Sequence, residues 1–152
     1  MSDNLLFTQI DLGAAMEEIA GDVEFIRIFM RFEFALKEKY GRQDWHKLST
    51  LLGDPFYHQM HEDGLAQTLL RSPPHSQHNE NGSLVWKKSI PPKNTHELFV
   101  SVSKVRNNLL HGGKSGHPDD NRNGSLIHES KIVLLAALAR DDELRSYFEG
   151  RY

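Results

Sequence analysis

Apolar residues recur at three- and four-residue steps in the first long segment of the chain, residues 14–40. Two such rows lie roughly opposite each other, one of Ile19, Val23, Ile26, Met30 and Phe34, the other of Phe25, Phe29, Phe32 and Leu36. At about 100° of turn per residue, this spacing is the period of an α-helix. The pattern predicts one long helix that ends at Gly41 and lies centrally, or buries its second side in a partner.

The pattern weakens between residues 42 and 94. Asp44 is a candidate N-cap for a short helix that ends before Pro55, and a second short helix is expected at about residues 59–70. Residues 72–94 are rich in Pro, Asn and Ser and contain the Asn81–Gly82 pair, and apart from Ile90 the apolar residues are Leu84–Trp86. We expect a polar loop here, with a short apolar flap packed on the helices, and no strand.

Two further helices are expected in the last third of the chain. Asn94 or Thr95 caps a helix that runs to about His111 and stops at Gly112 and Gly113. A polar loop at residues 114–124 separates it from a last helix at about residues 126–148. The apolar positions of that helix are Leu134, Leu135, Leu138, Leu144 and Phe148.

These elements predict an all-α fold in one domain over residues 1–152. It is expected to be an up-down helical bundle of two long helix pairs with short helices between them. A chain of 152 residues can bury most of its apolar surface without disulfides.

The amino-acid composition limits the kinds of functional site that the protein can have. The chain has no cysteine, which excludes disulfides, a thiolate nucleophile and a cysteine-type zinc site and fits a reducing cytosol. The start of the chain lacks the pattern of a secretory signal, and no apolar run approaches the roughly 20 residues of a membrane span. We therefore expect a cytoplasmic protein that does not associate with membranes.

The net charge of −3 argues against a protein that coats nucleic acid, but it permits a local positive pocket. Basic residues gather between residues 87 and 114, where Lys104 and Lys114 are candidate substrate-binding groups. A charge run is more often ordinary solvated surface.

The segment KVRNNLLHGG, residues 104–113, places Arg106 and His111 five residues apart near the end of a predicted helix. Arginine holds a phosphate through a planar fork of donors, and histidine exchanges a proton near neutral pH. Such a pair can cut a phosphodiester without a metal. The plainer interpretations are a structural arginine paired with an acid and a helix C-terminal histidine favoured by the macrodipole.

Arg106 falls inside the apolar face of its predicted helix, where an unpaired charge is costly. Glu33 occupies an apolar part of the first helix, whereas Glu17, Glu24 and Glu38 share its polar face. We therefore predict that Glu33 pairs with Arg106 and orients it.

On a regular helix, His111 points roughly 140° away from Arg106. Either the helix relaxes at the two glycines, or the site forms where two copies of this helix meet. Asn107, one turn before His111, could bond its ring, and Asn108 is also near.

Nine histidines invite a metal interpretation. His58 and His61 fit a helical i, i+3 pair, but no third ligand is placed beside them, and ligand sets need three or four groups. No metal or cofactor is expected.

Arg106, the polar Asn107 and His111 match the spacing that marks the HEPN superfamily, and the chain resembles that superfamily here. The flanking segment VRNNLLHGGK and the segment RFEFALK, residues 31–37, also resemble HEPN sequences. Together these segments cover about a quarter of the chain.

The resemblance implies a helical bundle that forms a homodimer with a composite active site across the interface. It also implies metal-independent cleavage of RNA by Arg106 and His111, with a 2′,3′-cyclic phosphate product, often in toxin, antiphage or stress systems with an antitoxin or regulatory protein as partner. Two alternatives stay open: a non-catalytic module that binds RNA or nucleotides, and an interaction or immunity protein.

Overall fold

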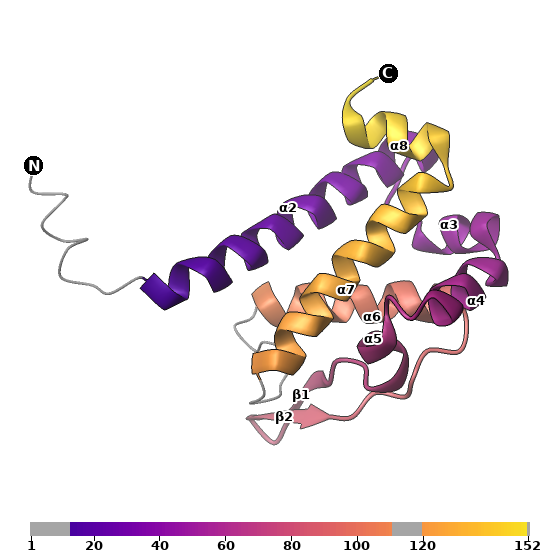
Figure 1. The fold of residues 1–152 in the computed structure, drawn as a ribbon. Helices are drawn as coiled ribbons and strands as arrows, with labels where there is room; N and C mark the ends of the chain where they lie inside the picture. Colours follow the sequence, from indigo (N-terminus) through magenta and orange to yellow (C-terminus); the bar gives the residue numbers. More distant parts are fainter. Residues whose placement is uncertain (1–12, 111–119, 152) are drawn as a thin grey trace, which may run out of the picture.

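The computed structural model describes residues 13–110 and 120–151, and its fold is mostly helical, as predicted. Three long helices, α2 (Gly13–Tyr40), α6 (Thr95–Leu110) and α7 (Asp120–Ala139), form the body of the molecule (Figure 1). The short helices are α3 (Trp45–Leu52), α4 (Asp54–Asp63), α5 (Gln67–Arg71) and α8 (Asp142–Glu149). Two pairs of long helices were expected, but the structure has three long helices, α2, α6 and α7, and the last helix, α8, is short.

Helix α2 buries one of its two apolar rows. Phe25, Phe29, Phe32 and Leu36 are fully buried against the other helices, whereas Val23 and Met30 on the other row are 44% and 62% exposed. The N-terminal half of α2 also reaches beyond the other helices (Figure 1). Val23 and Met30 of the second apolar row thus remain on the surface of this single chain, whereas Ile26 and Phe34 are partly buried.

The segment between α2 and α6 contains more elements than the sequence pattern indicated. Asp44 caps α3 as predicted, its Oδ1 accepting from the Lys47 N–H at 2.9 Å. The single helix predicted at about residues 59–70 is two helices, because Gly64 adopts a left-handed φ of 65° that ends α4. Helix α5 follows, and Glu129 of α7 accepts from the Thr68 and Leu69 N–H groups at its start.

The predicted polar loop at residues 72–94 contains a β-hairpin, so the expectation of no strand was wrong. Strand β1 (Ser76–Glu80) pairs antiparallel with β2 (Ser83–Lys87) around a turn at Asn81 and Gly82. Both turn residues have positive φ, 52° and 79°, as a two-residue hairpin turn requires. Strand β1 is polar throughout, so hydrophobic alternation could not reveal it.

Helix α6 agrees with its prediction as far as Leu110, and the side chain of Asn94 caps it by accepting from the Glu97 N–H at 2.9 Å. The last two helices, α7 and α8, differ from the prediction. Helix α7 begins at Asp120, so residues 120–124 are helical where a loop was expected. The predicted helix at residues 126–148 is broken at Asp141, which is extended and caps α8 through its side chain.

One apolar core joins these helices. The aromatic row of α2 shares one buried cluster with Leu98, Phe99 and Val102 of α6 and Leu134 of α7. Leu135, predicted as an apolar contact of the last helix, is 47% exposed. In the part of the chain that the structure describes, no helix combines the length and apolar character needed to cross a bilayer.

Candidate functional site

Arg106 lies in the last turns of α6 and faces α2. Its guanidinium carbon is 4.6 Å from the centroid of the buried Phe29 ring, and its Nη2 is 3.9 Å from Glu33 Oε2. The predicted pairing of Arg106 with Glu33 is therefore confirmed as an ion pair. The separation is too long for a hydrogen bond, so Glu33 acts on Arg106 through charge.

The donors of Arg106 are not used up by these contacts. Its side chain is 29% exposed, and its buried Nε has no hydrogen-bond partner among the described residues. The exposed part of the guanidinium can donate hydrogen bonds to a phosphate group from solvent, whereas the buried Nε cannot reach one.

Glu33 is the more buried member of the pair, with 16% of its side chain exposed. Burial raises the pKa of its carboxyl above the ordinary value, and the charges of Arg106 and Lys37 offset part of that shift. Helix α2 thus places the Glu33 carboxyl in a mostly buried position opposite the Arg106 cation.

The two asparagines of the motif have different surroundings. Asn107 is exposed, whereas Asn108 is buried and donates from Nδ2 to the His75 carbonyl oxygen at 3.0 Å. Asn108 therefore ties α6 to the residue just before β1. The predicted contact of Asn107 with the His111 ring lies partly outside the described residues.

Lys104 does not share a side of α6 with Arg106. Two positions apart on a helix, they point about 160° away from each other. Lys104 Nζ donates to Ser89 Oγ at 3.1 Å, beside the base of the hairpin. His111 and Lys114, the other predicted site residues, lie outside the described residues, and His111 directly follows the last described residue of α6.

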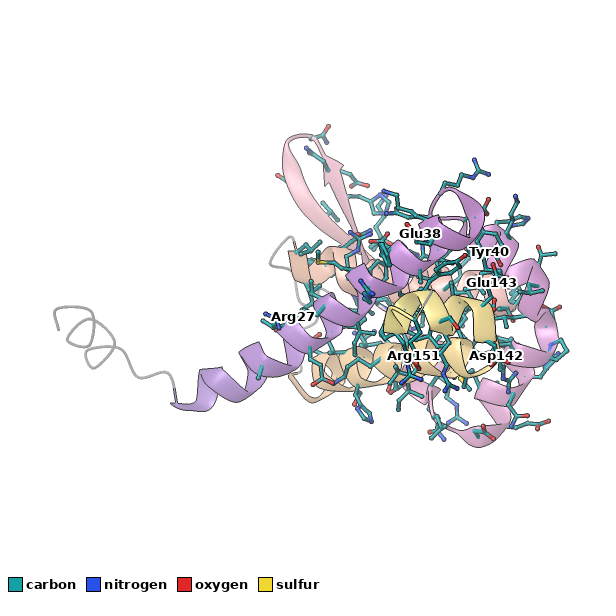
Figure 2. All side chains as sticks on the ribbon, turned by 90° about the horizontal axis from the view of Figure 1, so that it is seen from above. Arg27, Glu38, Tyr40, Asp142, Glu143 and Arg151 are labelled. Carbon is teal, nitrogen blue, oxygen red and sulfur yellow. The ribbon has the colours of Figure 1, made fainter. Side chains whose placement is uncertain are left out.

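An apolar hollow of about 360 Å³ lies beside Arg106, between α2 and the end of α6. Its apolar lining includes the exposed residues Val23, Met30 and Leu110, with Ile26 and Leu109. Arg27, which lies near the middle of α2 in Figure 2, also lines this hollow. The second apolar row of α2 and the end of α6, the helix that carries Arg106, thus line the same hollow.

Comparison of the chain with protein-family models, with curated proteins and with solved structures finds no match.

A polar hollow of about 430 Å³ lies at the opposite end of α6, where α3, α4 and α6 meet. His46 of α3 and His96 of α6 both line it, and their ring centroids are 5.3 Å apart. Sequence reasoning missed this pair because the two histidines are fifty positions apart and belong to no short motif. His58 and His61, the pair that sequence spacing suggested, both lie on α4, and no group of three or more potential metal ligands occurs in residues 13–110 and 120–151.

Proposed function

We propose that the protein is a metal-independent endoribonuclease of the HEPN type. The observation that carries this proposal is the setting of Arg106, whose guanidinium lies over Phe29 and opposite Glu33 while 29% of its side chain stays exposed. His111 follows Arg106 by five positions in the sequence. The two residue types needed for phosphodiester cleavage therefore come from one short stretch.

In the proposed reaction, the 2′-hydroxyl of RNA attacks the adjacent phosphorus. One imidazole of His111 removes the 2′-hydroxyl proton, and a protonated His111 imidazole gives a proton to the 5′-oxygen as the P–O5′ bond breaks. Arg106 stabilises the negative charge that grows on the phosphoryl oxygens. The products are a 2′,3′-cyclic phosphate and a free 5′-hydroxyl.

The proposed active assembly is a homodimer. A helical spacing of five residues directs Arg106 and His111 about 140° apart, so two copies of the motif supply a base, an acid and arginines more readily than one copy. The apolar surface beside Arg106 supports this assembly, because two copies that met there would bury Val23, Met30 and Leu110. This contact would also cover the second apolar row of α2.

The decisive experiment is digestion of a defined RNA in EDTA by the wild type and by Arg106→Ala and His111→Ala. We expect cleavage by the wild type, a cyclic phosphate end in the product, and loss of cleavage in both variants. Arg145→Ala and His128→Ala, at exposed side chains of α8 and α7, are the matched controls and should cleave normally.

A substrate with 2′-deoxyribose at the cleaved position should survive, because it lacks the nucleophile. Loss of cleavage in EDTA with recovery on added metal would overturn the proposal, as would full activity of both variants. Binding of RNA without cleavage, abolished in Arg106→Ala, would identify a non-catalytic module instead.

A further inference from the structure

The second apolar row of α2 follows the spacing of a coiled coil. Apolar residues alternate at three- and four-residue steps, at the a and d positions of a heptad, and we call these five positions the α2 seam: Met16, Ile19, Val23, Ile26 and Met30. Ile26 is partly buried, whereas 44% of Val23 and 62% of Met30 are exposed. The seam therefore presents apolar surface that the single chain leaves uncovered at Val23 and Met30.

The N-terminal part of α2, which carries the seam, extends past the rest of the fold in both views (Figures 1 and 2). The buried row of α2 attaches the helix to the core on a different side, through residues such as Phe25 and Phe29. A second chain can therefore contact the seam while the core of each chain stays intact.

Opposite charges flank the seam. With Val23 at an a position, Asp22 occupies the preceding g position and Arg27 the following e position, and both line the hollow beside α6. In a parallel pair of helices, a g residue faces the e residue five positions later on the other helix. Asp22 of each copy would thus face Arg27 of the other. A carboxylate has several acceptor sites, so contacts of Asp22 within its own chain do not prevent this pair.

The charges also select the direction of pairing. In an antiparallel pair, g positions face g positions and e positions face e positions. Asp22 would then meet Asp22 and Arg27 would meet Arg27, and like charges there disfavour the pair. The parallel arrangement is therefore the complementary one.

The end of α6 adds to the apolar contact. The seam covers about two heptads, fewer than the three or four that an independent coiled coil usually needs. Leu109 and Leu110 line the same hollow as Val23 and Met30, and 57% of Leu110 is exposed. Association through the seam should therefore involve α6 and depend on protein concentration.

We propose that two copies of the chain associate through the α2 seam as a short, parallel, two-stranded coiled coil with two reciprocal Asp22–Arg27 pairs. The proposal rests on the homodimer of the proposed function and specifies its geometry. Because the symmetry axis of a parallel pair runs along the helices, the two α6 ends lie at the same level beside the seam.

Charge reversal tests the flanking pairs. Asp22→Arg and Arg27→Asp each place like charges at both pairs, so sedimentation velocity should show the dimer dissociation constant rising about tenfold. The double variant Asp22→Arg/Arg27→Asp, and an equimolar mixture of the two single variants, should restore association. Glu62→Arg changes the net charge as Asp22→Arg does, at an exposed position on α4, and should have no effect.

Cysteine cross-linking tests the direction without changing a charge, since the chain has no cysteine of its own. Equal a positions are adjacent in a parallel pair, so Val23→Cys and Met30→Cys should each form a disulfide between copies under mild oxidation. An antiparallel pair can join at most one of these positions to itself, at its two-fold axis. Leu135→Cys, exposed on α7 outside the hollow, is the control and should form little cross-linked dimer.

A monomer at all concentrations, an unchanged dissociation constant in Arg27→Asp, or cross-linking at only one of the two a positions would overturn the parallel seam. These results are independent of RNA cleavage. A protein that cleaves RNA but fails the cross-linking test refutes only the seam, and a parallel dimer that does not cleave RNA refutes only the ribonuclease.

Discussion

Glu33 Oε2 and Arg106 Nη2 face each other at 3.9 Å across the contact between α2 and α6. The same guanidinium lies over the Phe29 ring, one turn of α2 before Glu33. A charge on one side and an aromatic face on another restrict the arginine while leaving its donors available. The pair thus joins the first helix to the motif helix at the point where the proposed chemistry takes place.

Replacement of Glu33 by glutamine should remove a pH dependence of stability. Burial raises the pKa of the Glu33 carboxyl above its ordinary value of 4.5, with Arg106 and Lys37 opposing the shift. The folded state therefore keeps this proton at pH values where the unfolded chain has released it, and stability falls as pH rises through that range. Urea unfolding at several pH values should show the wild type losing stability relative to Glu33→Gln between pH 4.5 and the raised pKa. A pH-independent difference would contradict this.

Arg106→Lys should retain the charge but lose function. Lysine cannot offer a planar fork of donors or stack on Phe29 in the same way, so it stabilises a phosphoryl oxygen less well. We expect kcat/KM for RNA cleavage to fall at least about tenfold, or about 1.4 kcal/mol in transition-state stabilisation. Arg145→Lys, at an exposed position on α8, should leave the rate unchanged.

Asn108→Ala should loosen the hairpin. The Asn108 Nδ2–H bond to the His75 carbonyl is buried beside β1, and its loss should lower the free energy of unfolding by about 1 kcal/mol. Hydrogen exchange of the β1 and β2 amides should also become faster. The exposed neighbour Asn107 supplies the control, because Asn107→Ala should change stability by less than about 0.5 kcal/mol. Equal effects of the two variants would count against the tether.

Asp141→Ala should destabilise α8. Asp141 caps α8 by accepting from the Leu144 N–H at 3.1 Å and pairs with Lys39 of α2. Figure 2 shows the sequence neighbours Tyr40 of α2 and Glu143 of α8 close together in that view. Loss of the cap should lower the free energy of unfolding by about 0.5–2 kcal/mol, measured by urea titration. Asp141→Asn keeps a capping side chain and should lose less.

The Lys39–Asp141 pair also predicts an alkaline limit. Burial by itself would lower the pKa of Lys39, but its hydrogen bond and charge interaction with Asp141 raise it above 10.5. The stabilisation is complete below 10.5 and should disappear as pH rises through the raised pKa. The wild type and Asp141→Asn should therefore converge in stability at strongly alkaline pH.

Met30→Lys should weaken self-association. Met30 is 62% exposed and lines the apolar hollow beside Arg106, so a charge there would be buried on contact between two copies. Sedimentation velocity should show a dimeric wild type and a more dissociated variant. Leu135→Lys changes an equally apolar, exposed residue of α7 outside that hollow and should leave the dimer intact. A monomeric wild type at all concentrations would refute the dimer.

Much of this architecture follows from local pattern. The end of α2, both ends of α3 and the start of α6 agree with the apolar periodicity and with the caps at Asp44 and Asn94, since both signals act within a turn or two of helix. The break before α8 also had a local signal, the capping side chain of Asp141, but a continuous apolar pattern concealed it. The only sequence signal for the hairpin was the Asn81–Gly82 pair at its turn, because the polar strand β1 shows no alternation of apolar and polar residues.

By itself, the sequence determined that the chain is helical and that Arg106 needs an acidic partner, because helical period and the cost of burying a charge depend on residue type and spacing. Only the tertiary structure decided which apolar row of α2 is buried, that Lys104 turns away from Arg106, and that His46 meets His96. Those outcomes depend on how distant helices pack against one another, and a contact between residues fifty positions apart leaves no mark in the local pattern of either segment.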